Sequence, residues 1–195
     1  MQTADRKKER LRKKKVERLI SRRTSHGTVQ YLVKWKGYSA FHNSWKDEDN
    51  LTTDLIRTYD KPIVDKERLT RNFDNLRLSV LFKLRSKSRS NAILDLDHDC
   101  FRFLFYGKGR EGREKGYTLL DKDDFKKCDL LENWDRVIDC NGDGVRVKYP
   151  FKIRLSLAKS PKTYPIINGK IQEDQRMLIE KLSIDFSRQP VTIQS

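Results

Sequence analysis

The chain has 195 residues, of which 36% are hydrophobic and 36% are charged. That length allows one medium domain or two small ones, each with a modest core. A mean hydropathy of −0.83 leaves no apolar run near the roughly 20 residues that cross a bilayer, so we expect no membrane partner. The N-terminal basic stretch is not followed by the apolar segment of a secretory signal, and we therefore expect an intracellular protein.

The three cysteines do not form a recognisable ligand or disulfide pattern. Cys100, Cys128 and Cys140 are an odd number, and their spacing fits neither a disulfide framework nor paired zinc ligands. Neither a phosphate-binding loop nor a dinucleotide fingerprint is present in the sequence. We therefore expect reduced thiols, no metal and no cofactor.

Positive charge is concentrated at the N-terminus. Residues 1–25 hold eleven Lys and Arg against three acidic residues, which is +8 of the total +15. Such a run gains most beside a polyanion, because binding releases condensed counterions. We predict DNA, RNA or an acidic protein surface as the neighbour, and the alternative is a solvated helix face or a nuclear-import signal. The candidate nucleic-acid-binding residues are Lys7, Lys8, Lys13, Lys14, Lys15, Arg18, Arg22 and Arg23.

After a basic N-terminal extension over residues 1–14, the pattern predicts a small sheet. Residues 16–23 roughly alternate, and residues 28–36 are rich in β-branched and aromatic side chains. A short Gly-containing loop lies between them, which predicts an antiparallel hairpin. Residues 42–46 form a third short strand. Helical spacing over 51–59 predicts a helix capped by Thr52 or Thr53, and Pro62 prevents its continuation. The expected product is a three-stranded antiparallel sheet with one helix across its end.

A longer motif lies within these elements. It consists of Tyr31-Leu32-Val33-Lys34-Trp35-Lys36-Gly37-Tyr38, then His42-Asn43-Ser44-Trp45, then Asn50-Leu51, with Val16-Glu17-Arg18-Leu19 and Arg22-Arg23 upstream. On these letters residues 15–62 resemble the chromodomain family. No family is recognised in the rest of the chain.

The resemblance implies a module that reads a methylated lysine on a histone tail. The tail lies as an added strand between the N-terminal segment and the segment before the helix. A trimethylammonium group is large and weakly hydrated, and electron-rich ring faces hold it best. Trp35 and Tyr38 match two of the family's three cage aromatics, and Val16 and Asn50 match positions that contact the tail's backbone. Asn50 alternatively caps the helix that follows.

The sequence also departs from the family pattern. Lys14 stands where the family has its first cage aromatic, and His42 stands where an acidic residue commonly flanks the cage. Lys46-Asp47 replaces the usual Glu-Pro. Phe41 is a candidate substitute wall, with packing against its own hairpin as the alternative, and Trp45 is expected in the hydrophobic interior. Incomplete cages of this kind also occur in chromodomains attached to retroelement integrases.

The remaining two thirds of the chain read as a linker and a second domain. Residues 63–91 contain packed segments and end in a basic, serine-rich hinge over 85–91. Residues 92–195 are predicted to be rich in strands, at 92–96, 100–106, 116–120, 137–139, 145–149 and 151–157, with a final helix over 173–182. The predicted fold class is therefore α+β, a small three-stranded sheet with a helix followed by a mainly β domain.

Two strings in this part resemble functional sites. Ile93 to Asp99 ends in an Asp-x-Asp pattern similar to the haloacid-dehalogenase nucleophile strand, but the expected alternation of strand and helix does not follow. Residues 139–144 fit half of a calcium loop, and a tight Asn-Gly hairpin turn accounts for the same letters. We therefore expect neither catalytic residues nor enzyme activity.

Two functions fit this sequence. In the first, a nuclear, chromatin-associated protein binds a methylated histone tail through Trp35, Tyr38 and Phe41, helped by a basic arm that binds nucleic acid, DNA in preference to RNA. In the second, the protein binds nucleic acid or derives from a retroelement, and its methyl-lysine cage is non-functional. The sequence predicts no oligomeric state.

Overall fold

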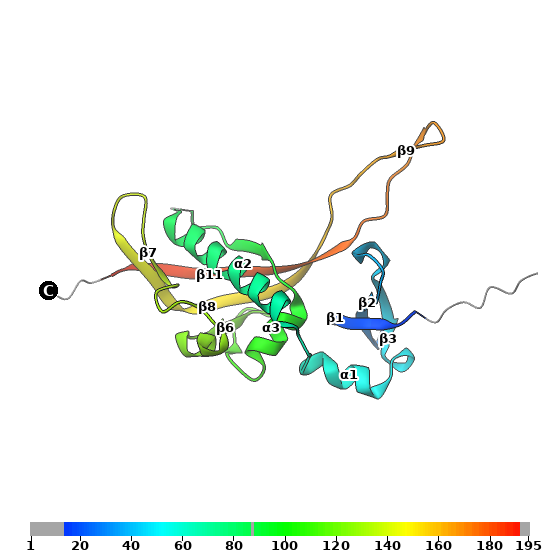
Figure 1. The fold of residues 1–195 in the computed structure, drawn as a ribbon, viewed down its shortest axis with the longest axis horizontal. Helices are drawn as coiled ribbons and strands as arrows, with labels where there is room; N and C mark the ends of the chain where they lie inside the picture. The colour runs from blue at the N-terminus through cyan, green and yellow to red at the C-terminus, as the bar shows by residue number, and fades with distance from the viewer. Residues whose placement is uncertain (1–13, 87, 192–195) are drawn as a thin grey trace, which may run out of the picture.

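Two antiparallel sheets with separate cores make up the fold. The computed structural model describes residues 14–86 and 88–191 (Figure 1). A three-stranded sheet in the order β1-β2-β3 comes first, and a six-stranded sheet follows it. The predicted α+β class, with a small sheet and helix before a second mainly β part, is confirmed. Across the described ranges, each helix is too short or too polar to cross a membrane.

The first sheet begins with a tight hairpin. His26 and Gly27 both have positive φ, 49° and 78°, which is the geometry of a two-residue turn matched to strand twist. One face buries Leu19, Tyr31 and Val33, and the first turns of the following helix pack against them. The strands are β1 (Val16–Ser25), β2 (Thr28–Trp35) and β3 (Ser44–Asp47), with short 3-10 turns η1 (Ala40–His42) and η2 (Glu48–Asn50).

Helix α1 (Thr53–Asp60) closes this sheet as predicted. The Thr52 hydroxyl accepts the N–H of Leu55 at 3.4 Å, so Thr52 is the N-cap. Tyr59 packs edge-on against Tyr31, with ring centroids 5.1 Å apart. The helix thereby covers the end of the small core.

A long helix, α2 (Lys66–Arg85), occupies most of the region described above as a linker with packed segments. Asp65 caps it by accepting the N–H of Arg68 at 2.8 Å. Leu76, Val80 and Leu84 recur at helical spacing and are at most 1% exposed. These side chains enter the core of the second sheet, so α2 packs with the C-terminal part of the chain.

The second sheet is built on two long strands, β8 and β11, which lie side by side (Figure 1). Phe151 is fully buried at its centre, where it stacks on Trp134 and meets Phe125 and Phe186. The order is β4-β11-β8-β6-β5, and β7 pairs with the end of β8. The elements are β4 (Ala92–Asp95), α3 (His98–Phe105), β5 (Arg110–Glu111), β6 (Thr118–Leu120), η3 (Lys122–Lys127), β7 (Arg136–Ile138), β8 (Gly144–Lys159) and β11 (Leu178–Pro190).

An extended arm projects from the far end of these two strands (Figure 1). It carries the short strands β9 (Ile166–Ile167) and β10 (Lys170–Ile171), which pair antiparallel. Residues 161–175 of the arm are exposed throughout.

Two predicted elements in the second part are wrong. Residues 100–106, expected as a strand, belong to helix α3, because Cys100, Leu104 and Phe105 share a buried helical face. The helix expected over 173–182 is absent from the described residues, and β11 begins at Leu178. Pairing with β8 and burial of alternate residues along β11 override the helical spacing of its first residues. The predicted hairpin turn over 139–144 is confirmed between β7 and β8.

Candidate functional site

Trp35 is held firmly at the end of β2. Its indole Nε1 donates to the Ser44 hydroxyl oxygen on β3 at 3.0 Å, which fixes the ring across the sheet. The turn after β2 uses Gly37 at a φ of 78° and returns the N–H of Tyr38 to the carbonyl of Trp35. Lys34, which sequence reasoning missed, donates to the Tyr38 carbonyl at 2.6 Å and so braces this turn.

An open hollow of about 490 Å³ lies beside the indole. Trp35 and Phe41 both line it, and Phe41 is 41% exposed. Tyr38, 38% exposed, does not line it, and its ring lies 5.4 Å from the His42 ring, which does. We call this space the cage hollow; it is lined by Lys14, Trp35, Phe41, His42, Asn43, Ser44, Lys46 and Gln175.

Each of the two main rings already faces an ammonium of the same chain. The Nζ of Lys14 lies 4.6 Å from the centroid of the Tyr38 ring. The Nζ of Lys46 lies 6.0 Å from the centroid of the Trp35 ring, at the outer limit of a cation–π contact. An incoming cation must therefore compete with Lys14 for Tyr38.

A known protein family matches this part of the chain. Residues 14–62 match the family described as the Chromo (CHRromatin Organisation MOdifier) domain. These residues include the first sheet, its aromatic rings and helix α1. Residues 14–62 form a chromodomain.

Three curated relatives show how much is shared. The chain is 44% identical to heterochromatin protein 1 of Drosophila melanogaster over 54 residues, which are 27% of this chain and 26% of that protein. It is 42% identical to human chromobox protein homolog 2 over 52 residues, 26% of this chain and 10% of that protein. It is 48% identical to human chromodomain-helicase-DNA-binding protein 1 over 31 residues, 16% of this chain and 2% of that protein. The chain thus spans about a quarter or less of each of these relatives.

The two positions expected to meet a peptide backbone lie at opposite borders of the chromodomain sheet. Val16 starts β1, pairs with Trp35 and is partly buried against the small core. Asn50 ends η2 and is exposed, two residues before the Thr52 cap. The alternative reading of Asn50 as a helix cap is therefore wrong, because Thr52 performs that role.

The structure separates the predicted nucleic-acid-binding residues. Lys7, Lys8 and Lys13 lie outside the described residues. Lys14, Lys15, Arg22 and Arg23 are exposed on the chromodomain. Arg23 also stacks over Trp45, 4.0 Å from its centroid, so this ring is only partly buried and not in the interior as expected.

Arg18 points away from solvent into a cluster of carboxylates on the second part of the chain. Its guanidinium donates to Asp99 at 2.9 Å and to Glu180 at 2.5 Å. Asp99 is 1% exposed and also accepts from Arg68 at 2.7 Å. A phosphate could reach Arg18 only by breaking these pairs, so we leave Arg18 out of the proposed nucleic-acid contacts.

Helix α3 supplies a second contact to the chromodomain. Arg102 donates to the backbone carbonyls of Leu19 and Ile20 on β1, at 2.7 and 2.9 Å, and to that of Tyr59 at 2.7 Å. Its guanidinium also lies 3.8 Å from the Tyr59 ring centroid. Sequence reasoning missed Arg102, although a lone charge between Phe101 and Phe103 is a usable signal. We call the contacts made by Arg18 and Arg102 the junction.

The junction lowers the pKa of one of its acids, Asp97. Burial raises the pKa of the Asp97 carboxyl, but the charges of Arg18 and Arg68 outweigh burial and hold it below its ordinary value of 3.8. One oxygen of Asp97 accepts from Arg68, Arg71 and Asn72. These carboxylates are engaged by guanidinium and amide groups, and this arrangement stabilises the contact between the two parts of the chain.

The dehalogenase-like string does not assemble into a reactive pair. Asp95 ends β4 on the surface and pairs with Lys181 at 2.5 Å. Asp97 follows in the junction cluster. The two carboxylates therefore have separate partners.

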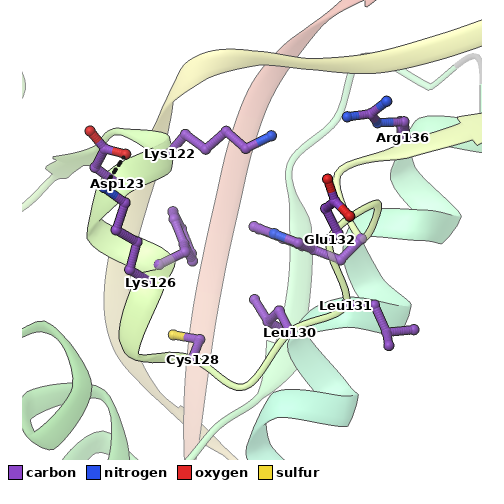
Figure 2. A pocket seen from close by; sticks show the side chains of 10 residues that line it. Lys122, Asp123, Lys126, Cys128, Leu130, Leu131, Glu132 and Arg136 are labelled. Atoms are coloured by element: carbon purple, nitrogen blue, oxygen red, sulfur yellow. Dashed lines mark ion pairs between the residues drawn. The ribbon is translucent and has the colours of Figure 1, made fainter.

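A second hollow, of about 340 Å³, lies between η3 and the loop before β7 (Figure 2). Lys122 and Arg136 point toward one another across it, above the labelled Leu130 and Cys128 (Figure 2). Lys122 lies 3.0 Å from the buried carboxylate of Asp135, which also accepts from the Tyr149 hydroxyl at 3.1 Å. These contacts fasten η3 to the sheet, and sequence reasoning predicted no site here.

Proposed function

We propose that this chain is a nuclear, chromatin-associated protein whose chromodomain binds a lysine-methylated histone tail with low affinity. The observation that supports this is the Trp35 indole, fixed by Ser44, on an open hollow that Phe41 also lines. A methylated ammonium placed there meets ring faces and little competing carboxylate, which favours a cation with a weak hydration shell. The names of two relatives, heterochromatin protein 1 and chromobox protein homolog 2, support an assignment to chromatin.

Low affinity follows from two features of the cage. Lys14 replaces an aromatic ring and rests on Tyr38, so the ligand must displace one cation and approach another. His42 stands where the family has its flanking acid, so the negative charge of that acid is missing from the cage. Exposed Lys14 and Lys15, with the basic residues before them, add attraction to nearby DNA phosphates in compensation.

A second function draws support from the same lysines. If Lys14 and Lys46 remain on the Tyr38 and Trp35 rings, the cage is closed to a third cation. The chain then binds chromatin through nucleic acid alone, as in the retroelement-derived alternative. The two proposals differ in whether methylation of the peptide changes its affinity.

The test is a fluorescence-anisotropy titration of the full chain with histone-tail peptides that are trimethylated or unmodified. We expect the trimethylated peptide to bind at least about threefold more tightly, a difference near 0.7 kcal/mol. Trp35→Ala and Phe41→Ala should each abolish the difference, because both side chains line the cage hollow. Phe103→Ala is the control, because Phe103 is an aromatic of similar exposure, 44%, outside the chromodomain.

Circular dichroism of each variant separates a lost cage from a lost fold. Phe41→Ala is the safer variant, because the Phe41 ring is exposed and lies outside the small core. Equal binding of both peptides to the wild-type chain would remove the methyl-lysine proposal and favour the nucleic-acid alternative.

A further inference from the structure

The outer face of the second sheet carries a row of positive charge along β8. Along β8, alternate residues such as Val147, Phe151 and Ile153 point into the core and are at most 1% exposed. Because successive strand residues point to opposite faces, the residues between them point away from the core. Four of these are basic, and we call them the β8 stripe: Arg146, Lys148, Lys152 and Arg154.

The stripe consists of two close pairs of cations, with Pro150 between them. Residues two apart on a strand are separated by about 7 Å, so Arg146 and Lys148 form one close pair and Lys152 and Arg154 another. The whole stripe extends about 27 Å along β8. That length corresponds to most of one turn of a DNA duplex.

The neighbouring strand does little to neutralise this charge. On β11, Gln189, Ser187 and Ser183 stand directly opposite Arg146, Lys148 and Arg154. Lys152 faces Asp185, but that carboxylate also lies 3.3 Å from the Lys83 ammonium. Lys152 has a partner in Glu114 at 2.5 Å.

Repulsion between cations of the stripe and of β7 reduces the stability of the sheet. In the part of the chain that the structure describes, Arg146, Lys148 and Arg154 make no ion pair. Arg136 on β7 stands directly opposite Arg146. Like charges directly opposite in an antiparallel pair are destabilising, and an external anion relieves the repulsion.

We infer that the β8 stripe binds the phosphate backbone of duplex DNA, as a second contact separate from the N-terminal basic run. Surfaces that bind nucleic acid are polar and strongly cationic, whereas the centre of a protein interface is apolar and aromatic. The residues opposite the stripe on β11 are small or polar, so this side of the stripe offers no apolar anchor for a protein partner. On the other side a single apolar residue, Leu119 of β6, stands opposite Lys152.

The aromatic ring nearest the stripe points to duplex and not to single-stranded DNA. Tyr117 has the Lys152 ammonium 4.6 Å and the Arg154 guanidinium 4.9 Å from its ring centroid. These cations compete with an unpaired base for the ring that single-strand binding would use for stacking. A duplex needs only the cations, because its bases are already stacked.

The experiment measures binding of the full chain to a short DNA duplex by fluorescence anisotropy over a range of salt concentrations. The stripe variant carries Arg146→Gln, Lys148→Gln, Lys152→Gln and Arg154→Gln. Each phosphate contact contributes about 0.9 to the slope of log affinity against log salt, so we expect the slope to shrink by about three to four. At low salt the affinity should fall at least about tenfold.

A matched control removes the same net charge elsewhere. It replaces four exposed cations on separate elements by Gln: Arg57, Lys66, Lys127 and Lys170. We expect this variant to keep nearly the whole slope. A third variant, Arg146→Lys with Arg154→Lys, keeps the charge and should also keep the slope.

The inference does not depend on the chromodomain cage. We therefore expect Trp35→Ala to show the same slope of log duplex affinity against log salt as the wild-type chain. The inference is overturned if the salt dependence of duplex affinity falls by the same amount in the stripe variant and in the matched control, while circular dichroism shows that both are folded. Polyglutamate and single-stranded DNA serve as competitors. An unlabelled duplex is the reference competitor. If polyglutamate or single-stranded DNA displaces the labelled duplex as effectively as this reference at equal total charge, the assignment to duplex DNA is wrong.

Discussion

The ammonium of Lys14 lies over the ring of Tyr38, and we propose that Lys14 thereby limits which cations the chromodomain accepts. In aqueous surroundings such a contact contributes about 0.5–1 kcal/mol. A methylated lysine from a histone tail gains a similar amount from the same ring, so the exchange of one cation for the other is nearly neutral. Discrimination then depends on Trp35 and Phe41, which the incoming group meets in the cage hollow.

Replacing Lys14 by Ala should raise the affinity for a trimethylated tail peptide. Removal of the resident cation frees the Tyr38 ring and relieves like-charge repulsion, and we expect a gain of about threefold to tenfold. The measurement is the anisotropy titration described above. Lys15→Ala is the control, because Lys15 is exposed and adjacent, and the same gain in that variant would show a general charge effect and contradict the role given to Lys14.

His98 gives a pH dependence at the residue scale. Burial lowers its pKa below the ordinary value of 6.5, although the Glu180 carboxylate acts in the opposite direction. Its Nε2 lies 3.1 and 3.3 Å from two backbone carbonyl oxygens, of Ser156 and Lys181, to which the neutral ring donates. The unfolded chain therefore binds a proton more readily than the folded chain, and unfolding free energy is lost as the pH falls through 6.5 and then through the lower folded pKa.

We expect the urea midpoint of the wild-type chain to be higher near pH 7.5 than near pH 5.5. In His98→Gln the difference in urea midpoint between pH 7.5 and pH 5.5 should be smaller than in the wild-type chain, whatever the variant does to absolute stability. The control is His26→Asn in the exposed hairpin turn. If the urea midpoint of His98→Gln changes with pH as much as that of the wild-type chain, other groups cause the pH dependence.

At the scale of elements, β1 is an edge strand whose open side is covered by α3. Arg102 donates hydrogen bonds to the carbonyls of Leu19 and Ile20, and the Arg18 guanidinium points into the carboxylate cluster. Unpaired edge strands invite further strand pairing, so this cover directs an added peptide strand to the other side of the chromodomain. The proposed tail position, between the N-terminal segment and the segment that ends at Asn50, is consistent with it.

Replacing Arg18 by Met should destabilise the protein by about 3–5 kcal/mol, because Asp99 and Glu180 lose a buried partner charge. Chemical denaturation provides the measurement. Arg22→Met, an exposed neighbour on the same strand, should cost less than about 1 kcal/mol. Equal costs would mean that the Arg18 cluster contributes no more than an exposed pair.

Elements were predictable from the sequence where local pattern and tertiary packing agree. The hairpin with His26 and Gly27, the helix capped by Thr52 and the turn over 139–144 all carry strong local signals. The pattern at 173–182 was misread because strand pairing with β8 determines its conformation. The junction was out of reach, since Arg18 and Glu180 are 162 residues apart and nothing in either segment indicates their contact.

At the scale of the whole molecule, the junction holds the chromodomain against the second part of the chain. Arg18 of the chromodomain pairs with Asp99 of α3 and Glu180 of β11. In the other direction, Arg102 of α3 donates to backbone carbonyls of the chromodomain. The β8 stripe and the exposed lysines at the start of the chromodomain thus belong to one body. We propose that chromatin binding by this protein combines a weak peptide contact with separate DNA contacts, and that binding is tighter when both contacts form together.

Arg102→Ala should weaken the coupling between the two parts. Loss of its three backbone contacts should broaden the thermal unfolding transition or divide it into two, because each part keeps its own core. Differential scanning calorimetry measures this, and Arg57→Ala on the exposed face of α1 is the control. A single transition of unchanged width in Arg102→Ala would show that the two parts are coupled by other contacts.

The most direct measurement is nuclear magnetic resonance of the full chain bound to a tail peptide labelled at its trimethylated lysine. The account predicts nuclear Overhauser contacts from the trimethyl protons to the indole of Trp35 and to the rings of Tyr38 and Phe41, together with release of Lys14 from Tyr38. Contacts of the trimethyl protons with none of these rings, while the peptide is bound, would contradict the cage as the site of recognition.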